Sequence, residues 1–135
     1  MSRGYLVVRV AGAPFGLPVS RVLEVGDVGD VLDVPRTLPA VRGLTPLRGH
    51  LVPLIHLGAL LGGRSAPAER GRSTVLVELG ARQVAFEVDD VDEVVREDAL
   101  PVPRGEDLPW AVGVARQEGT LIPILDLDAL EDRIG

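Results

Sequence analysis

The chain has 135 residues and a net charge of −6, with 46% apolar but only 3% aromatic residues. The negative charge disfavours nucleic acid and anionic membrane surfaces, because both are bound chiefly through Lys and Arg. Cysteine is absent, which excludes disulfides and thiolate chemistry and fits a reducing compartment. No apolar run approaches the ~20 residues of a membrane helix, and no signal-peptide core precedes the first strand pattern. We therefore expect a cytoplasmic protein without direct membrane insertion.

Short segments rich in Val, Ile and Leu, each bounded by Gly or Pro, predict β-strands along most of the chain. In chain order these are Tyr5–Val10, Phe15–Leu17, Leu51–Ile55, Thr74–Leu79, Val84–Val88 and Leu121–Leu125. Pro53 and Pro123 lack the backbone N–H of a strand ladder, so each predicts an edge strand or a bulge. Short helices are expected over Gly58–Leu61 and Asp126–Asp132, with Asp126 or Asp128 capping the second.

A twelve-residue segment occurs twice, seventy residues apart. GHLVPLIHLGAL at 49–60 returns as GTLIPILDLDAL at 119–130, with six identical positions, and the strand at 5–10 matches 74–79. Repetition at a fixed period indicates one supersecondary unit used twice. A unit of ~60 residues is marginal alone, so the halves should share or abut a core. Many short strands favour two small closed barrels, joined by a Gly-, Pro- and charge-rich connector at 62–72.

Motifs for catalysis and metal binding are absent from the sequence. The two histidines are His50, interpreted as a turn residue, and His56, interpreted as a cap where the second repeat has Asp126. No nucleophile elbow, paired-histidine metal motif or phosphate-binding glycine loop is present. We therefore expect no enzyme, no cofactor and no metal, and a binding protein is favoured.

One acidic cluster leaves an alternative open. It comprises Asp89, Asp90, Asp92 and Glu93, and paired carboxylates can perform acid–base chemistry or hold a cation. Interleaved valines instead favour a short amphipathic turn with a solvated acidic face. A hydrolase built on this cluster is therefore the alternative to a binding protein.

Seven short motifs follow one another along the chain. They are FGLPV at 15–19, VLEV at 22–25, VPRTLP at 34–39, RGLTPLRG at 42–49, VPLIHL at 52–57, VDDVDEVV at 88–95 and LIPILDLDAL at 121–130. In this order they resemble the chemotaxis coupling-protein family, the CheW-like domain. The resemblance implies a mainly β fold of two tandem, intertwined five-stranded SH3-like β-barrels with short helices.

The resemblance also implies a domain organisation. Residues 1–135 form a single CheW-like domain, with subdomain 1 at about 12–72 and subdomain 2 at about 73–135. The N-terminal strand, 1–11, is a candidate for exchange between the two subdomains.

The function implied by the resemblance is that of a non-catalytic adaptor in a chemosensory signalling array. It would couple the cytoplasmic tips of chemoreceptors, the methyl-accepting chemotaxis proteins, to the regulatory domain of a CheA-type histidine kinase. The receptor's helical hairpin is expected in a groove between the subdomains. Carried over by motif position, the groove residues are Val22, Glu24, Arg48, Val88 and Asp89.

Other roles for these residues stay open. Val22 and Val88 are equally compatible with core positions, and Glu24 matches Glu93 in the repeat, which suggests a structural partner. Arg48 has Glu118 as its counterpart, so the barrel itself does not require an arginine there. Pro46 and His56 replace the family's usual Asn and Asp. The alternative function is a divergent CheW-like scaffold that self-associates or binds other CheW-like domains without kinase coupling.

Overall fold

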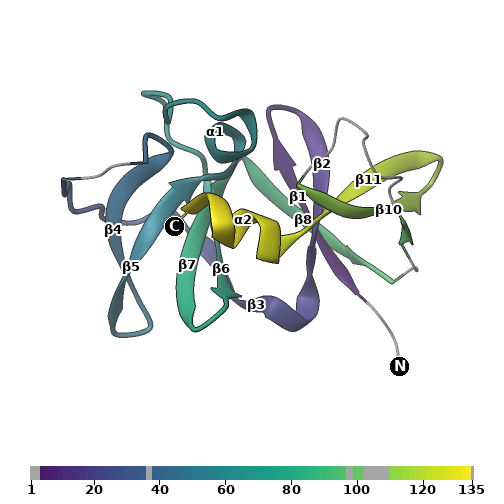
Figure 1. Ribbon diagram of the computed structural model, residues 1–135, viewed down its shortest axis with the longest axis horizontal. Helices are drawn as coiled ribbons and strands as arrows, with labels where there is room; N and C mark the ends of the chain where they lie inside the picture. The colour runs from purple at the N-terminus through teal and green to yellow at the C-terminus, as the bar shows by residue number, and fades with distance from the viewer. Residues whose placement is uncertain (1–3, 36–37, 97–98, 102–109, 135) are drawn as a thin grey trace.

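The computed structural model describes residues 4–35, 38–96, 99–101 and 110–134, which are mainly β (Figure 1). The elements in chain order are β1 (Tyr5–Val10), β2 (Ala13–Pro18), the 3-10 turn η1 (Val19–Arg21), β3 (Val22–Asp27), β4 (Val41–Leu47), β5 (His50–His56), α1 (Leu57–Gly62), β6 (Ser73–Leu79), β7 (Arg82–Val88), β8 (Asp90–Val95), β9 (Leu100–Pro101), β10 (Ala111–Gln117), β11 (Thr120–Leu125) and α2 (Leu127–Ile134). All six strands predicted from the sequence are confirmed, and β3, β4, β8, β9 and β10 were not predicted. The acidic stretch expected to be a turn forms strand β8 instead.

The strands form two SH3-like barrel sheets that lie side by side, with α2 between them (Figure 1). The first barrel has the strand order β3-β6-β7-β5-β4, and the second has β8-β1-β2-β11-β10-β9. The second therefore carries one strand more than the five expected, namely the two-residue β9. In the first barrel a single bridge between Leu32 and Leu44 takes the corresponding place.

The two repeats exchange their first hairpins. Hairpin β6–β7 belongs to the second repeat by sequence, yet it lies between β3 and β5 of the first. Hairpin β1–β2 of the first repeat lies in turn between β8 and β11 of the second. The parallel pairing matches as well, since Leu54 pairs with Ala85 and Ile124 pairs with Gly16. The exchange is thus reciprocal and keeps the same register on both sides.

The strand pairing crosses the boundary expected between residues 72 and 73. Strands β6 and β7 lie beyond that boundary but pair within the first barrel, and β2 lies before it but pairs within the second. Repeat similarity marks equivalent segments, and it carries no information on which copy of a partner strand a hairpin joins. The division into subdomains at 12–72 and 73–135 stays a prediction. Each sheet itself contains strands from both sides of that boundary.

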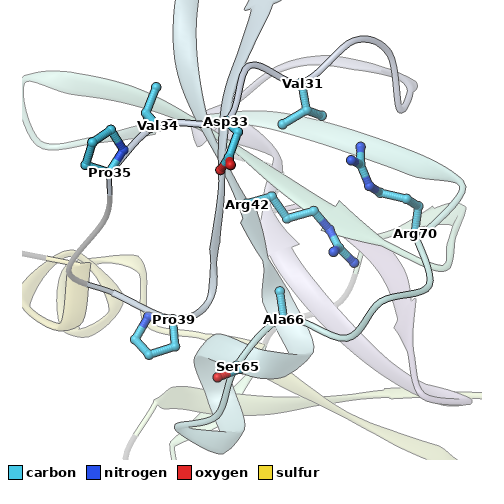
Figure 2. A pocket seen from close by; sticks show the side chains of 9 residues that line it. All are labelled: Val31, Asp33, Val34, Pro35, Pro39, Arg42, Ser65, Ala66 and Arg70. Carbon is cyan, nitrogen blue, oxygen red and sulfur yellow. The ribbon is translucent and has the colours of Figure 1, made fainter.

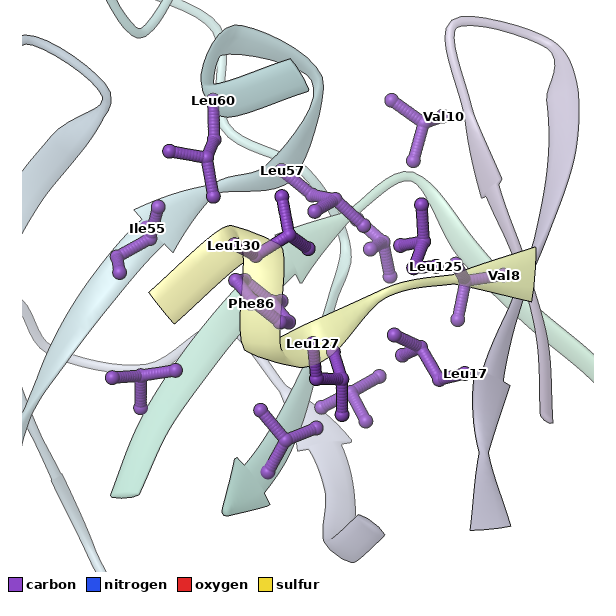
Figure 3. Close-up of a cluster of buried hydrophobic side chains, with 14 of the residues drawn as sticks. Val8, Val10, Leu17, Ile55, Leu57, Leu60, Phe86, Leu125, Leu127 and Leu130 are labelled. Atoms are coloured by element: carbon purple, nitrogen blue, oxygen red, sulfur yellow. The ribbon is translucent and has the colours of Figure 1, made fainter. Parts of the chain in front are cut away.

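A shared core lies between the barrels and draws on both repeats (Figure 3). Equivalent residues occur in it in pairs: Leu17 with Phe86, Ile55 with Leu125, Leu57 with Leu127 and Leu60 with Leu130. Each barrel also has a small core of its own. The first contains Val52, Leu54, Leu76 and Ala85, and the second contains Val7, Val95, Ala115, Ile122 and Ile124.

Pro53 lies in β5, between β7 and β4, and not at the edge or bulge that the sequence predicts. Its partner Leu44 uses both backbone groups elsewhere, donating to Leu32 O at 2.9 Å and accepting from Leu32 N at 2.7 Å. Leu44 therefore directs both backbone groups away from β5, so Pro53 faces β4 at a pair that has no ladder hydrogen bonds. The parallel pairing with β7 begins at Leu54, one residue after the proline.

Gly43 marks the place where this neighbouring segment comes closest. A Cβ on Gly43 would lie 2.1 Å from the carbonyl oxygen of Leu32, and the glycine has a φ of 153°. Its counterpart Gly113 would meet Leu100 O at 2.7 Å. Both barrels thus use a glycine to admit a neighbouring backbone segment, one against β4 and the other against β10.

Candidate functional site

Arg48 lies in the tight turn between β4 and β5, where it is exposed and has a left-handed φ of 53°. With Gly49 at φ 79° it forms a two-residue hairpin turn that requires positive φ at both positions. Its guanidinium Nη1 donates to the carbonyl oxygen of Leu23 in β3 at 3.4 Å. Arg48 therefore lies beside the strand that carries Val22 and Glu24.

These two neighbours differ in exposure. Val22 is half-buried and packs against the shared core, while Glu24 is exposed on β3 in register with Leu76. In the second barrel Glu93, the counterpart of Glu24, accepts from Gln117 Nε2 at 2.5 Å. That contact joins the end of β10 to β8, and the Arg48 contact joins the β4–β5 turn to β3. The structure thus brings Val22, Glu24 and Arg48 to one region of the first barrel.

Val88 and Asp89 lie at the junction of β7 and β8. Val88 is 2% exposed and packs in the shared core, which is the core role that the sequence left open for it. Asp89 Oδ2 accepts from the backbone N–H of Ala11 at 2.8 Å, and its own N–H donates to Arg9 O at 2.9 Å. Asp89 therefore contacts the β1–β2 turn and not the β4–β5 turn, so a common groove for all five residues stays a prediction.

The acidic cluster is divided among separate partners. Asp89 binds Ala11, Asp92 pairs with Arg9 at 2.9 Å, and Glu93 binds Gln117. The part of the chain that the structure describes contains no group of three or more side chains able to hold a metal ion. The arrangement gives no support to a hydrolase built on these carboxylates.

His56 is the N-cap of α1, as predicted, and Asp126 has the same place before α2. His56 Nδ1 accepts from Ala59 N at 3.0 Å, and Asp126 Oδ1 accepts from Ala129 N at 3.2 Å. The capping nitrogen must be unprotonated to accept this bond. Burial lowers the pKa of His56 below its ordinary value of 6.5, and the opposing effect of Glu87 is smaller.

The arrangement defines a class of protein: a duplicated SH3-like double barrel with exchanged hairpins and one shared core. The chain belongs to the CheW-like domain family, whose model matches residues 4–134. This membership confirms the resemblance seen in the sequence and the prediction that the chain is not an enzyme. No helix within the described ranges is long and apolar enough to cross a membrane.

Several similar proteins have names that match this family. A protein named Chemotaxis protein CheW from Thermotoga maritima is 28% identical over 120 residues, which cover 86% of this chain and 79% of that protein. Its namesake from Klebsiella aerogenes is 24% identical over 91 residues, covering 67% of this chain and 55% of that protein. The crystal structure of the scaffolding protein TtCheW from Thermoanaerobacter tengcongensis has a TM-score of 0.84 at 25% identity, over 96% of this chain and 92% of that one.

The cap at His56 predicts a pH dependence of stability. Because the folded-state pKa is lowered, the unfolded chain takes up the proton more readily, so the unfolding free energy should fall as pH drops below about 6.5. His56→Asn should keep the cap and remove this part of the dependence, since Asn caps without titrating. Urea unfolding at several pH values measures the effect. His50, interpreted from the sequence as a turn residue, is the exposed first residue of β5, and His50→Asn is the control. Equal pH slopes for wild type and His56→Asn would contradict the assignment.

Proposed function

We propose that this chain is a non-catalytic cytoplasmic adaptor that couples the cytoplasmic tips of chemoreceptors to a CheA-type histidine kinase. The observation that carries the proposal is the match to the CheW-like family over residues 4–134, which includes every motif noted in the sequence. The relatives named Chemotaxis protein CheW and the scaffolding protein TtCheW support a chemotaxis role.

The geometry suits a protein that holds two binding partners in a fixed relative orientation. The exchanged hairpins and the shared core join the barrels through buried contacts, so surfaces on the two barrels keep their relative orientation. An adaptor needs this rigidity, because flexible linkage between its partners would transmit less of a receptor's change to the kinase. A stiff body of this kind supports the proposal that the two barrels carry the two partner surfaces.

Arg48 is the residue that we assign to receptor binding most directly. It is exposed, it lies beside Val22 and Glu24, and its counterpart in the second repeat is Glu118. The second barrel forms the same turn with that glutamate at φ 47°, so the fold does not depend on an arginine there. The charge on Arg48 is therefore available for a partner.

A second candidate function is a scaffold that associates with itself or with other CheW-like domains without kinase coupling. Large apolar side chains are exposed at equivalent positions of the two barrels, with Leu51 54% exposed and Leu121 61%, and Val25 and Val94 form another such pair. Equivalent apolar positions on both barrels would let one barrel face of a copy pair with the like face of another.

Replacing Arg48 tests the adaptor proposal. Arg48→Ala should weaken the effect of the protein on receptor-controlled kinase activity, measured with purified receptor, kinase and adaptor. The unfolding free energy should change by about 0.5 kcal/mol or less, because alanine already occupies the same backbone conformation at Ala11, where φ is 53°. Arg116→Ala, at an exposed arginine of the second barrel, is the matched control. Unchanged coupling in Arg48→Ala would contradict the assignment.

Replacing the exposed leucine of the second barrel distinguishes the two candidate functions. If the scaffold function holds, Leu121→Ser should shift a self-associated species to the monomer in size-exclusion chromatography with light scattering. If the adaptor function holds, the purified wild type runs as a monomer and binds receptor or kinase in pull-down. A wild type that is monomeric and binds neither partner would contradict both.

A further inference from the structure

A buried ion pair joins two strands of the first barrel. Glu87 of β7 is 0% exposed, the side chain of Arg42 of β4 is 9% exposed, and Arg42 Nε donates to Glu87 Oε1. Strand β5 lies between β4 and β7, and Glu87 is in register with His56 at its end. A charge this deeply buried is tolerated only with good partners.

The remaining donors of this pair reach the connector between the repeats. Arg42 Nη1 donates to Pro67 O at 2.6 Å and Nη2 donates to Glu69 O at 2.6 Å. The second carboxylate oxygen of Glu87 accepts from the backbone N–H of Gly71. One ion pair therefore fastens the connector at three backbone positions.

Besides these contacts, the part of the connector at 66–72 has one backbone hydrogen bond at each end, from Ala66 N to Pro39 O at 3.0 Å and from Val28 N to Arg72 O at 3.2 Å. Most of residues 62–72 are exposed, and Ala66 and Gly71 are half-buried. It passes between two open hollows, one of about 910 Å³ and one of about 470 Å³. Figure 2 shows Arg42, which lines the larger hollow, with its guanidinium pointing toward the segment that carries Ala66 and Arg70. Between these two bonds hydrophobic burial is small, so the polar contacts of Arg42 and Glu87 hold residues 67–71.

The second barrel shows that the fold does not need this pair. The counterpart of Arg42 is Val112, which is 56% exposed, and the counterpart of Glu87 is Pro18. The second barrel therefore forms its sheet without a buried charge at either position. What distinguishes the first barrel is the connector that must lead from α1 to β6, and the ion pair is directed at that segment.

We infer that Arg42 and Glu87 form a clamp that holds residues 66–71 as an ordered strap across the junction between the two barrels. The smaller hollow beneath the strap is lined by Ala11 of the second barrel's β1–β2 turn, by Asp89 at the junction of β7 and β8, and by His56 of the first barrel. The guanidinium of Arg42 is occupied by protein groups, so the larger hollow is not an anion site. Loss of the clamp opens the strap while the barrels stay folded.

Limited trypsin digestion tests the clamp, because the connector contains Arg64, Arg70 and Arg72. Trypsin cuts after arginine, so one candidate bond is the peptide bond between Arg70 and Gly71. The N–H of this bond is that of Gly71, which donates to the carboxylate of Glu87. Glu87→Gln should raise the cleavage rate at this bond by about tenfold or more, since removing one partner of a buried pair costs several times the energy of a tenfold change. Arg42→Lys keeps a charge opposite Glu87 but loses the two carbonyl contacts, and should also raise the rate.

Asp92→Asn is the control, because it breaks the exposed pair with Arg9 and should leave cleavage at Arg70 unchanged. Mass spectrometry of the fragments identifies the bonds that are cut. Rates at Arg70 equal to the wild type in both clamp variants would overturn the inference. An equal rise at Arg9 and Arg21, which lie in or beside strands, would also overturn it, because it would show global unfolding in place of local opening.

Discussion

The shared core between the barrels is the constraint on which the rest of the structure depends. Hairpins β1–β2 and β6–β7 each lie in the sheet of the other repeat, so their strands are covered on both faces. In β1, Leu6 and Val8 enter the shared core and Val7 enters the core of the second barrel; in β6, Val75 and Val77 enter the shared core and Leu76 enters that of the first. Burial on both faces explains why these strands are continuous apolar runs and do not alternate.

This arrangement also explains why so much of the fold was predictable. The doubly buried strands and the two strand–helix junctions carry the strongest apolar patterns, and the caps His56 and Asp126 follow from their place before a helix. Strands such as β3 and β8 escaped prediction because one face is exposed and carries residues such as Glu24 and Glu93. The exchange itself leaves no local trace, since either pairing uses the same sequences.

The candidate site was predictable only in part. Arg48 stood out because Glu118 replaces it in the repeat, and the structure finds it exposed at a turn. The burial of Val88 and the contact of Asp89 with Ala11 depend on the exchanged hairpins and could not be derived from motifs. The pair of Arg42 and Glu87 lies 45 residues apart in sequence, and its one signal was that both counterparts, Val112 and Pro18, are uncharged.

The central claim is that two small barrels form one cooperative unit because they share a core. Native-state hydrogen exchange at increasing urea tests it most directly, with amides of β1 reporting on the second barrel and amides of β6 on the first. The account predicts that the slowest amides of both strands open with the same free energy and the same dependence on urea. Opening of one strand at a lower free energy, while the other stays protected, would contradict it.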